Sequence, residues 1–151
     1  MEHYGLHLSK DSLKYGFQKE SPLSALAFFL SSPQVWVPRK TSEKECQIFR
    51  STLQSHPLLS ADQIVVHGCY LLNPASERAD VRKKTDTLFV NELQVCDALG
   101  VGKYVFHPGT YSGKDVQVGL QTTVDLIQLG LRDSKNVQIL VENMTKSHTL
   151  C

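Results

Sequence analysis

Two histidines and one glutamate each stand directly after a short apolar run of the chain: His67, His107 and Glu142. Two imidazoles and one carboxylate form a ligand set that suits Zn²⁺. Such a set leaves a coordination position for water, and zinc lowers the pKa of that water until it becomes a nucleophile near neutral pH. The three residues therefore predict a metal centre that activates water.

The distances along the chain between these residues are those of strand–helix units. His107 lies 40 residues after His67 (107 − 67), and Glu142 lies 35 residues after His107 (142 − 107). A strand with its crossover helix takes about 30 residues or more, so each side chain is expected to come from a different strand. Because the C-terminal ends of parallel strands face one side of the fold, we expect the three side chains to converge there.

Each of the three residues also has a simpler explanation. A single histidine after a strand is more often a hydrogen-bonded loop residue than a metal ligand, since histidine is only intermediate in burial. A glutamate after a strand is usually a solvated loop charge or a neighbour of a helix N-cap. Convergence on one face favours a shared site, but the pattern alone leaves zinc chemistry, a sugar isomerase and coincidence open.

The elements that would position these residues alternate along the chain. Short runs of β-branched and aromatic residues, bounded by polar ones, predict buried strands. Strands of this kind suit a parallel sheet with helices on its outer face. The runs are Tyr4–Leu6, Leu26–Leu30, Ile64–Val66, Tyr104–Phe106 and Val137–Val141.

Longer amphipathic stretches between the runs predict helices. One begins with Thr41 or Ser42 as N-cap and ends near residue 56, one covers 77–99 and stops at Gly100, and one covers 114–131. The alternation predicts an α/β fold with right-handed crossovers, made of about five strands and four helices. A doubly wound sheet fits this count, as does the first half of a (β/α)8 TIM barrel, which needs about 250 residues in all.

Composition narrows the class of protein. The 151 residues are 41% hydrophobic and 21% charged, which is typical of a globular protein. The formal charge of +1 does not indicate a global field for nucleic acid. A transmembrane helix and a secretory signal are not expected. The four cysteines form no C-x-x-C pair, so they predict reduced thiols, with Cys46 and Cys96 buried in helices.

Short motifs follow one another in a fixed order along the chain. Each is weak alone, and the ordered set is more specific. Together they resemble the endonuclease IV family of apurinic/apyrimidinic (AP) endonucleases, and most of all its eukaryotic, fungal-type members. The motifs are Gly5–Ser9, Phe29–Trp36, Ile64–Asn73, Phe106–Gly109 and Leu140–Met144.

The resemblance implies a TIM barrel with a three-zinc site that cleaves the phosphodiester 5′ to an abasic site. His67 and His107 match the two histidines on the first zinc of the family. Glu142 matches the catalytic carboxylate that bridges the first and second zinc ions. Tyr70 matches a residue that enters the DNA at the lesion, and the loop around Gln34 matches another DNA-penetrating loop, where the bacterial enzyme has an arginine.

The resemblance also implies that residues 1–151 are a partial TIM-barrel AP endonuclease domain, truncated after the fifth strand, because the family takes its remaining ligands from later strands. We then expect up to three zinc ions in the intact enzyme, at most one well-formed zinc site here, and no activity of this chain alone. The expected partner is double-stranded DNA with abasic sites. The protein is expected to be a monomer and not to bind a membrane. The expected location is the nucleus, with the mitochondrion as a second place, or the cytoplasm for a non-functional chain.

Two alternative functions stay open: a sugar-isomerase-like TIM-barrel enzyme, and a non-catalytic zinc-binding remnant. Sugar isomerases of related barrels also place histidine and glutamate at strand ends. The His-Gly-x-Tyr segment favours the nuclease, because Tyr70 would serve as a wedge against unstacked bases.

Overall fold

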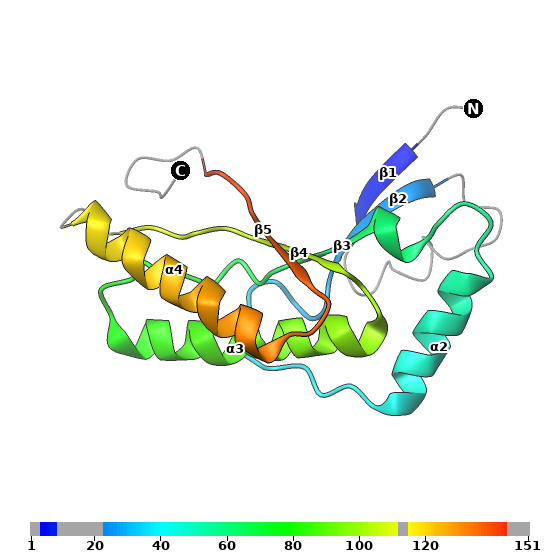
Figure 1. Ribbon diagram of the computed structural model, residues 1–151, viewed down its shortest axis with the longest axis horizontal. Helices are drawn as coiled ribbons and strands as arrows, with labels where there is room; N and C mark the ends of the chain where they lie inside the picture. Colours follow the sequence, from blue (N-terminus) through cyan, green and yellow to red (C-terminus); the bar gives the residue numbers. More distant parts are fainter. Residues whose placement is uncertain (1–3, 9–22, 112–114, 145–151) are drawn as a thin grey trace.

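The computed structural model describes residues 4–8, 23–111 and 115–144. Its strands form one parallel sheet in the order β1-β2-β3-β4-β5, so that each strand lies beside its neighbour in sequence (Figure 1). The five predicted strands are confirmed, and the fold is a partial barrel rather than a doubly wound sheet. The strands are β1 (Tyr4–Leu8), β2 (Leu23–Phe29), β3 (Ile64–His67), β4 (Lys103–Phe106) and β5 (Gln138–Val141).

The described ranges contain three α-helices, α2 (Glu43–Gln54), α3 (Ala79–Leu99) and α4 (Val116–Asp133), and a short 3₁₀ helix, η2 (Ala61–Gln63). The three helices whose position was predicted are confirmed, and each of their ends lies within two residues of the predicted one. The expected fourth α-helix is not found in these ranges, and residues 9–22 between β1 and β2 lie outside them. In Figure 1, α3 runs along the sheet with α4 beside it. None of the described helices is long and apolar enough to cross a membrane.

The predicted start of α2 and the predicted end of α3 are each stabilised by residues close in sequence. Ser42 caps α2: its hydroxyl accepts from the Glu45 N–H at 3.3 Å, while the Glu45 carboxylate accepts from the Ser42 N–H at 2.8 Å. This reciprocal pair satisfies two N–H groups that the first helical turn leaves without partners. At the end of α3, Gly100 takes the left-handed conformation with φ of 74°, which costs glycine no steric penalty.

One face of the sheet is buried under α3. The ring of Phe89 on α3 lies 5.4 Å from that of Tyr104 and 5.0 Å from that of Phe106, centroid to centroid. Alternate residues of the central strands fill this core, as the two-residue period of a strand requires. The strand residues that fill it are Leu26, Phe28, Ile64, Val66, Tyr104 and Phe106. The thiols of Cys46 and Cys96 are free and buried among them, as predicted.

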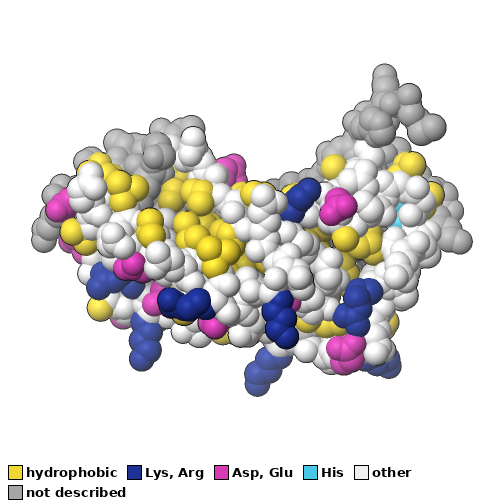
Figure 2. Space-filling model, in the orientation of Figure 1, with side chains coloured by type: hydrophobic (Ala, Val, Ile, Leu, Met, Phe, Trp, Pro, Cys, Tyr) yellow, Lys and Arg dark blue, Asp and Glu magenta, His cyan; other side chains and the backbone are white. Residues whose placement is uncertain are grey.

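A second apolar surface lies on α4. Figure 2 shows hydrophobic side chains gathered on the face that carries this helix. A closed barrel packs such side chains between neighbouring elements. The exposed large apolar side chains of α4 are Val116, Val118, Leu120, Val124 and Leu131.

Candidate metal centre

The register of the sheet places the three predicted ligands on one face. His67 ends β3 and pairs with Val105 of β4, so His107, two residues further along, points to the same side as His67. Phe106 pairs with Val141, and the N–H of Glu142 donates to the Phe106 carbonyl at 3.0 Å. Glu142 therefore stands beside His107, and all three side chains project from the face opposite α3.

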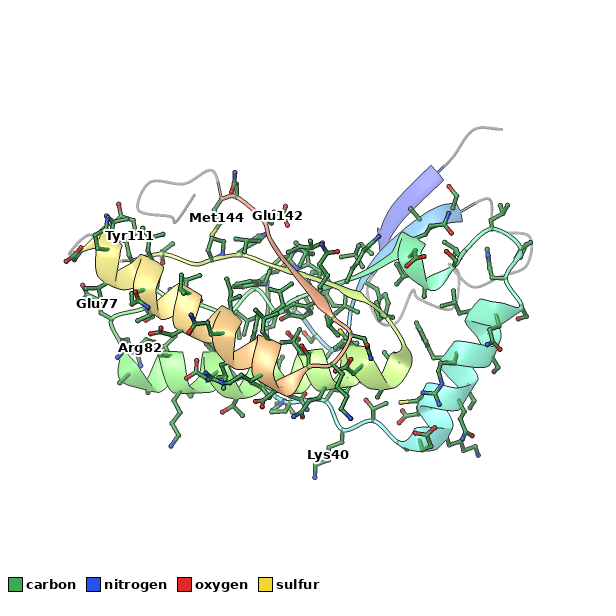
Figure 3. The ribbon with its side chains drawn as sticks, viewed as in Figure 1. Lys40, Glu77, Arg82, Tyr111, Glu142 and Met144 are labelled. Carbon is green, nitrogen blue, oxygen red and sulfur yellow. The ribbon has the colours of Figure 1, made fainter. Side chains whose placement is uncertain are left out.

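The three side chains meet within coordinating distance. Nε2 of His67 lies 3.2 Å from Oε2 of Glu142, and Nε2 of His107 lies 3.3 Å from the same oxygen. One ligand atom from each residue lies within 4.8 Å of the other two. Ligand atoms bound to one tetrahedral zinc ion at about 2.0–2.2 Å are roughly 3.3–3.6 Å apart, so the two histidine–glutamate distances are close to those around a shared ion. Figure 3 shows Glu142 directly after β5.

His67 is held by a backbone contact as well. Its Nδ1 lies 2.8 Å from the Gly68 carbonyl oxygen, which only accepts, so Nδ1 carries the proton and donates. In the neutral ring this tautomer has its lone pair on Nε2, the atom that faces Glu142. Such contacts fix the tautomer and the ring orientation of metal-binding histidines.

Aromatic side chains form one wall of this group. Tyr70 is 49% exposed, and its ring centroid lies 5.2 Å from that of His67 and 5.8 Å from that of His107. Phe29 is the last residue of β2, and its ring centroid lies 5.0 Å from the ring centroids of both His67 and Tyr70. The Tyr70 ring is therefore accessible to solvent and stands next to the candidate ligands.

Gln34 is also exposed, in the turn that follows β2. That turn is joined directly to the segment of Tyr70. The carbonyl of Pro33 accepts from the Tyr70 N–H at 2.9 Å and from the Cys69 thiol at 3.1 Å. Burial raises the pKa of the Cys69 thiol, which keeps it a neutral donor. The two residues predicted to contact DNA therefore sit on segments that are hydrogen-bonded to each other.

The loops after β3 and β4 are tied together by Asn73. Its Oδ1 accepts from the Thr110 N–H at 3.0 Å, and its Nδ2 donates to the Thr110 hydroxyl at 3.2 Å. Between His107 and Thr110, Gly109 has φ of 88° and packs against Asn73 so closely that no side chain would fit. Asn73 thus holds the His107 loop in place relative to the His67 loop.

A buried acid lies beneath the group. Glu92 of α3 is 2% exposed, and its Oε2 accepts from the Tyr104 hydroxyl at 2.6 Å and from the Cys69 N–H at 3.3 Å. Burial raises the pKa of Glu92 to about 7, although both hydrogen bonds act to lower it. The carboxyl therefore changes charge near neutral pH.

Sequence reasoning assigned no role to Phe29, Asn73 or Glu92. For Glu92 a signal was present: it occupies an apolar position of α3, in step with the buried residues Leu88, Phe89 and Cys96. An acid at such a position indicates a specific partner, because a buried carboxyl without one is costly. Asn73 and Phe29 carry no comparable signal, since an asparagine in a loop and a phenylalanine in an apolar strand are ordinary residues at such positions.

The sequence of this chain is similar to those of known proteins. The sequence model of a family described as xylose isomerase-like TIM barrel matches residues 19–151. Apurinic-apyrimidinic endonuclease 1 of Schizosaccharomyces pombe is 33% identical over 121 residues, which are 80% of this chain and 35% of that protein. Probable endonuclease 4 of Petrotoga mobilis is 29% identical over 150 residues, 94% of this chain and 51% of that protein.

A solved structure shares the fold over almost all of this chain. The crystal structure of endonuclease IV from Thermus thermophilus superimposes with a TM-score of 0.73 at 25% identity, over 97% of this chain and 54% of that one. The chain thus spans between 35% and 54% of the length of these three relatives.

Proposed function

Because the chain belongs to the xylose isomerase-like TIM barrel family and, within it, to the endonuclease IV family, we propose that it forms part of a zinc-dependent AP endonuclease that cleaves the phosphodiester 5′ to abasic sites. Since the chain covers about half the length of its relatives or less, incision is proposed for the whole protein. Metal binding and recognition of damaged DNA are proposed for this chain. The proposed setting is repair of nuclear DNA, with mitochondrial DNA as a second place, by a monomer.

The observation that carries this proposal is the convergence of His67, His107 and Glu142 beside the exposed ring of Tyr70. Nε2 of each histidine and Oε2 of Glu142 would hold the ion. When bound, Zn²⁺ would supply a Lewis acid for the phosphate and an acidified water. Within the described ranges this is the one such group of three ligands, so further zinc ions of the whole enzyme would need other ligands.

The residues around the ion would divide the remaining work. The Gly68 carbonyl orients His67, and Asn73 holds the loop of His107, so the ligands are in place before DNA arrives. Preformed geometry of this kind removes ordering costs from the bound state. Tyr70 would enter the base stack at the abasic site, where a missing base leaves room for a ring. Gln34, on the adjoining turn, would contact the same distorted segment of the duplex.

A binding comparison tests the proposal. The purified chain, with and without Zn²⁺, is titrated with a duplex that carries one tetrahydrofuran abasic analogue and with the undamaged duplex of the same sequence. We expect preference for the damaged duplex that depends on zinc and is lost in His107→Ala. The whole protein that contains this chain is then assayed for zinc-dependent incision 5′ to the analogue.

Equal binding to both duplexes, or binding unaffected by zinc, would contradict the proposed function. Zinc-dependent interconversion of an aldose and a ketose, without preference for damaged DNA, would support the sugar isomerase instead. Zinc binding with neither property would support a non-catalytic remnant.

Tyr70→Ala is expected to lower the preference for the abasic duplex by roughly 5- to 150-fold, because stacking of one base on an aromatic side chain contributes about 1–3 kcal/mol. Tyr70→Phe keeps the ring and should keep the preference. Fluorescence anisotropy on the two duplexes gives the ratio of the dissociation constants. A Tyr70→Ala ratio equal to that of the parent chain, with zinc affinity unchanged, would remove the wedge role.

A further inference from the structure

Glu92 is a buried acid without an ionic partner within the described ranges. It is 2% exposed and lies on the inner side of α3 between apolar residues. The salt bridges of the described chain do not include it. Burying a carboxyl costs several kcal/mol unless hydrogen bonds compensate, so the two bonds that Glu92 accepts define its role in the fold.

One of the two bonds ends on the segment that follows His67, and the other ends on a β4 residue that packs against that segment. Oε2 of Glu92 accepts from the Tyr104 hydroxyl of β4 and from the main-chain N–H of Cys69, two residues after His67. The Tyr104 hydroxyl in turn packs directly against Gly68, where a Cβ atom would collide with it. The backbone of Gly68 and Cys69 therefore rests on the pair formed by Glu92 and Tyr104.

The same segment is held from two other sides. The Gly68 N–H donates to the Val105 carbonyl at 2.7 Å, and the Tyr70 N–H donates to the Pro33 carbonyl at 2.9 Å. Glu92 supplies the third support, from α3, and it is the only one of the three made by a side chain. An apolar residue in its place would leave the Tyr104 hydroxyl and the Cys69 N–H buried without acceptors, which is unfavourable for each group. The segment would then move to recover these bonds elsewhere.

We propose that Glu92 is a positioning residue: through the Cys69 N–H it sets the place of the Tyr70 ring beside His67 and His107. This role rests on the proposed function, because the Tyr70 ring is the one that would enter damaged DNA. Glu92 lies on α3, 23 residues after Cys69, and would align that ring. Glu92 does not touch substrate, and it acts on Tyr70 only through the backbone.

The test uses ¹H–¹⁵N and NOE spectra of the chain and of two variants. Glu92→Gln keeps an oxygen that accepts both hydrogen bonds, whereas Glu92→Leu removes it. In the parent chain and in Glu92→Gln we expect NOEs between the Tyr70 ring and the rings of His67 and His107, whose centroids are 5.2 and 5.8 Å away. In Glu92→Leu these NOEs are lost, and hydrogen exchange of the Cys69 and Tyr70 amides is at least tenfold faster, while α2 amides are unchanged.

Where circular dichroism shows that Glu92→Leu is unfolded, Glu92→Asp takes its place, because a side chain one methylene shorter cannot reach both donors. Parent-like NOEs in a folded variant that has lost protection of the Cys69 amide would overturn the proposal. Loss of the NOEs in Glu92→Gln as well would also overturn it, since the acceptor is retained there. Neither spectrum involves zinc or DNA, so a chain that fails to prefer abasic DNA would refute the proposed function and leave this result standing.

Discussion

His67→Ala is expected to lower the affinity of the chain for Zn²⁺ by more than 100-fold. Loss of an outer hydrogen-bond partner of a metal ligand costs about 10- to 100-fold in affinity, and loss of the ligand itself must cost more. His67 is the most buried of the three candidates, at 7% exposed, and its Nε2 faces Glu142 at 3.2 Å. A water molecule in its place would not restore the position or the donor strength of the imidazole.

The matched control is His56→Ala. His56 is equally buried, at 7% exposed, but its Nδ1 accepts from the N–H groups of Leu58 and Leu59 in the turn after α2. This change should lower stability while zinc affinity stays that of the parent chain. Competition with a chromophoric zinc chelator measures both variants. If His67→Ala and His56→Ala bind zinc equally well, the three residues are a hydrogen-bonded group and not a metal site.

The second large effect is a loss of stability with rising pH that originates at Glu92. Its pKa is about 7 in the folded chain against 4.5 for an ordinary glutamate, with burial as the main cause. A raised carboxyl pKa means that the folded state binds the proton more tightly than the unfolded state. The stabilisation is therefore complete below about pH 4.5 and is lost as pH rises through 7. The difference of 7 − 4.5 = 2.5 pKa units corresponds to roughly 3 kcal/mol.

The titratable groups that interact with Glu92 do not change charge in the pH range of this effect. Tyr104, Cys69 and Cys96 interact with Glu92, and burial raises the pKa of each above its ordinary value, so all three stay neutral from pH 5 to pH 8. Urea unfolding at pH 5, 6, 7 and 8, with EDTA present, is compared between the parent chain and Glu92→Gln. The free energy of unfolding of the parent chain should fall by roughly 2–3 kcal/mol relative to the variant over this range, because part of the full effect is already lost at pH 5. A difference between the two proteins that stays constant within about 1 kcal/mol would show that Glu92 does not titrate there.

Much of the fold follows from local patterns in the chain. Ser42 and Glu45 form a capping box because a hydroxyl and a carboxylate three residues apart reach each other's N–H groups in the first helical turn. Gly100 ends α3 because a left-handed residue follows most readily where there is no Cβ. The strand runs were recognisable because β-branched and aromatic residues pack well on a pleated surface. These signals depend on neighbours in sequence, so the chain alone was sufficient for them.

The candidate ligands and their convergence at one edge of the sheet were predicted from the sequence and are confirmed, but the strand register that brings their side chains together could not be predicted. A strand directs successive side chains to opposite faces, so a shift of one residue in the pairing of β3 with β4 would send His67 and His107 to different sides. The observed register, His67 with Val105 and Phe106 with Val141, is set by the packing of the whole sheet against α3. The spacing of 40 and 35 residues is the same for either register.

The sequence by itself determined which residue types end the strands, where the helices begin and end, and the family to which the ordered motifs point. Tertiary structure alone decided that Glu92 supports the Cys69 N–H and that the Pro33 carbonyl joins the turn of Gln34 to Tyr70. The physical reason is that these contacts use main-chain N–H and carbonyl groups, which every residue other than proline carries in full. Since such groups leave no signature in the order of side chains, only the folded chain shows which of them meet.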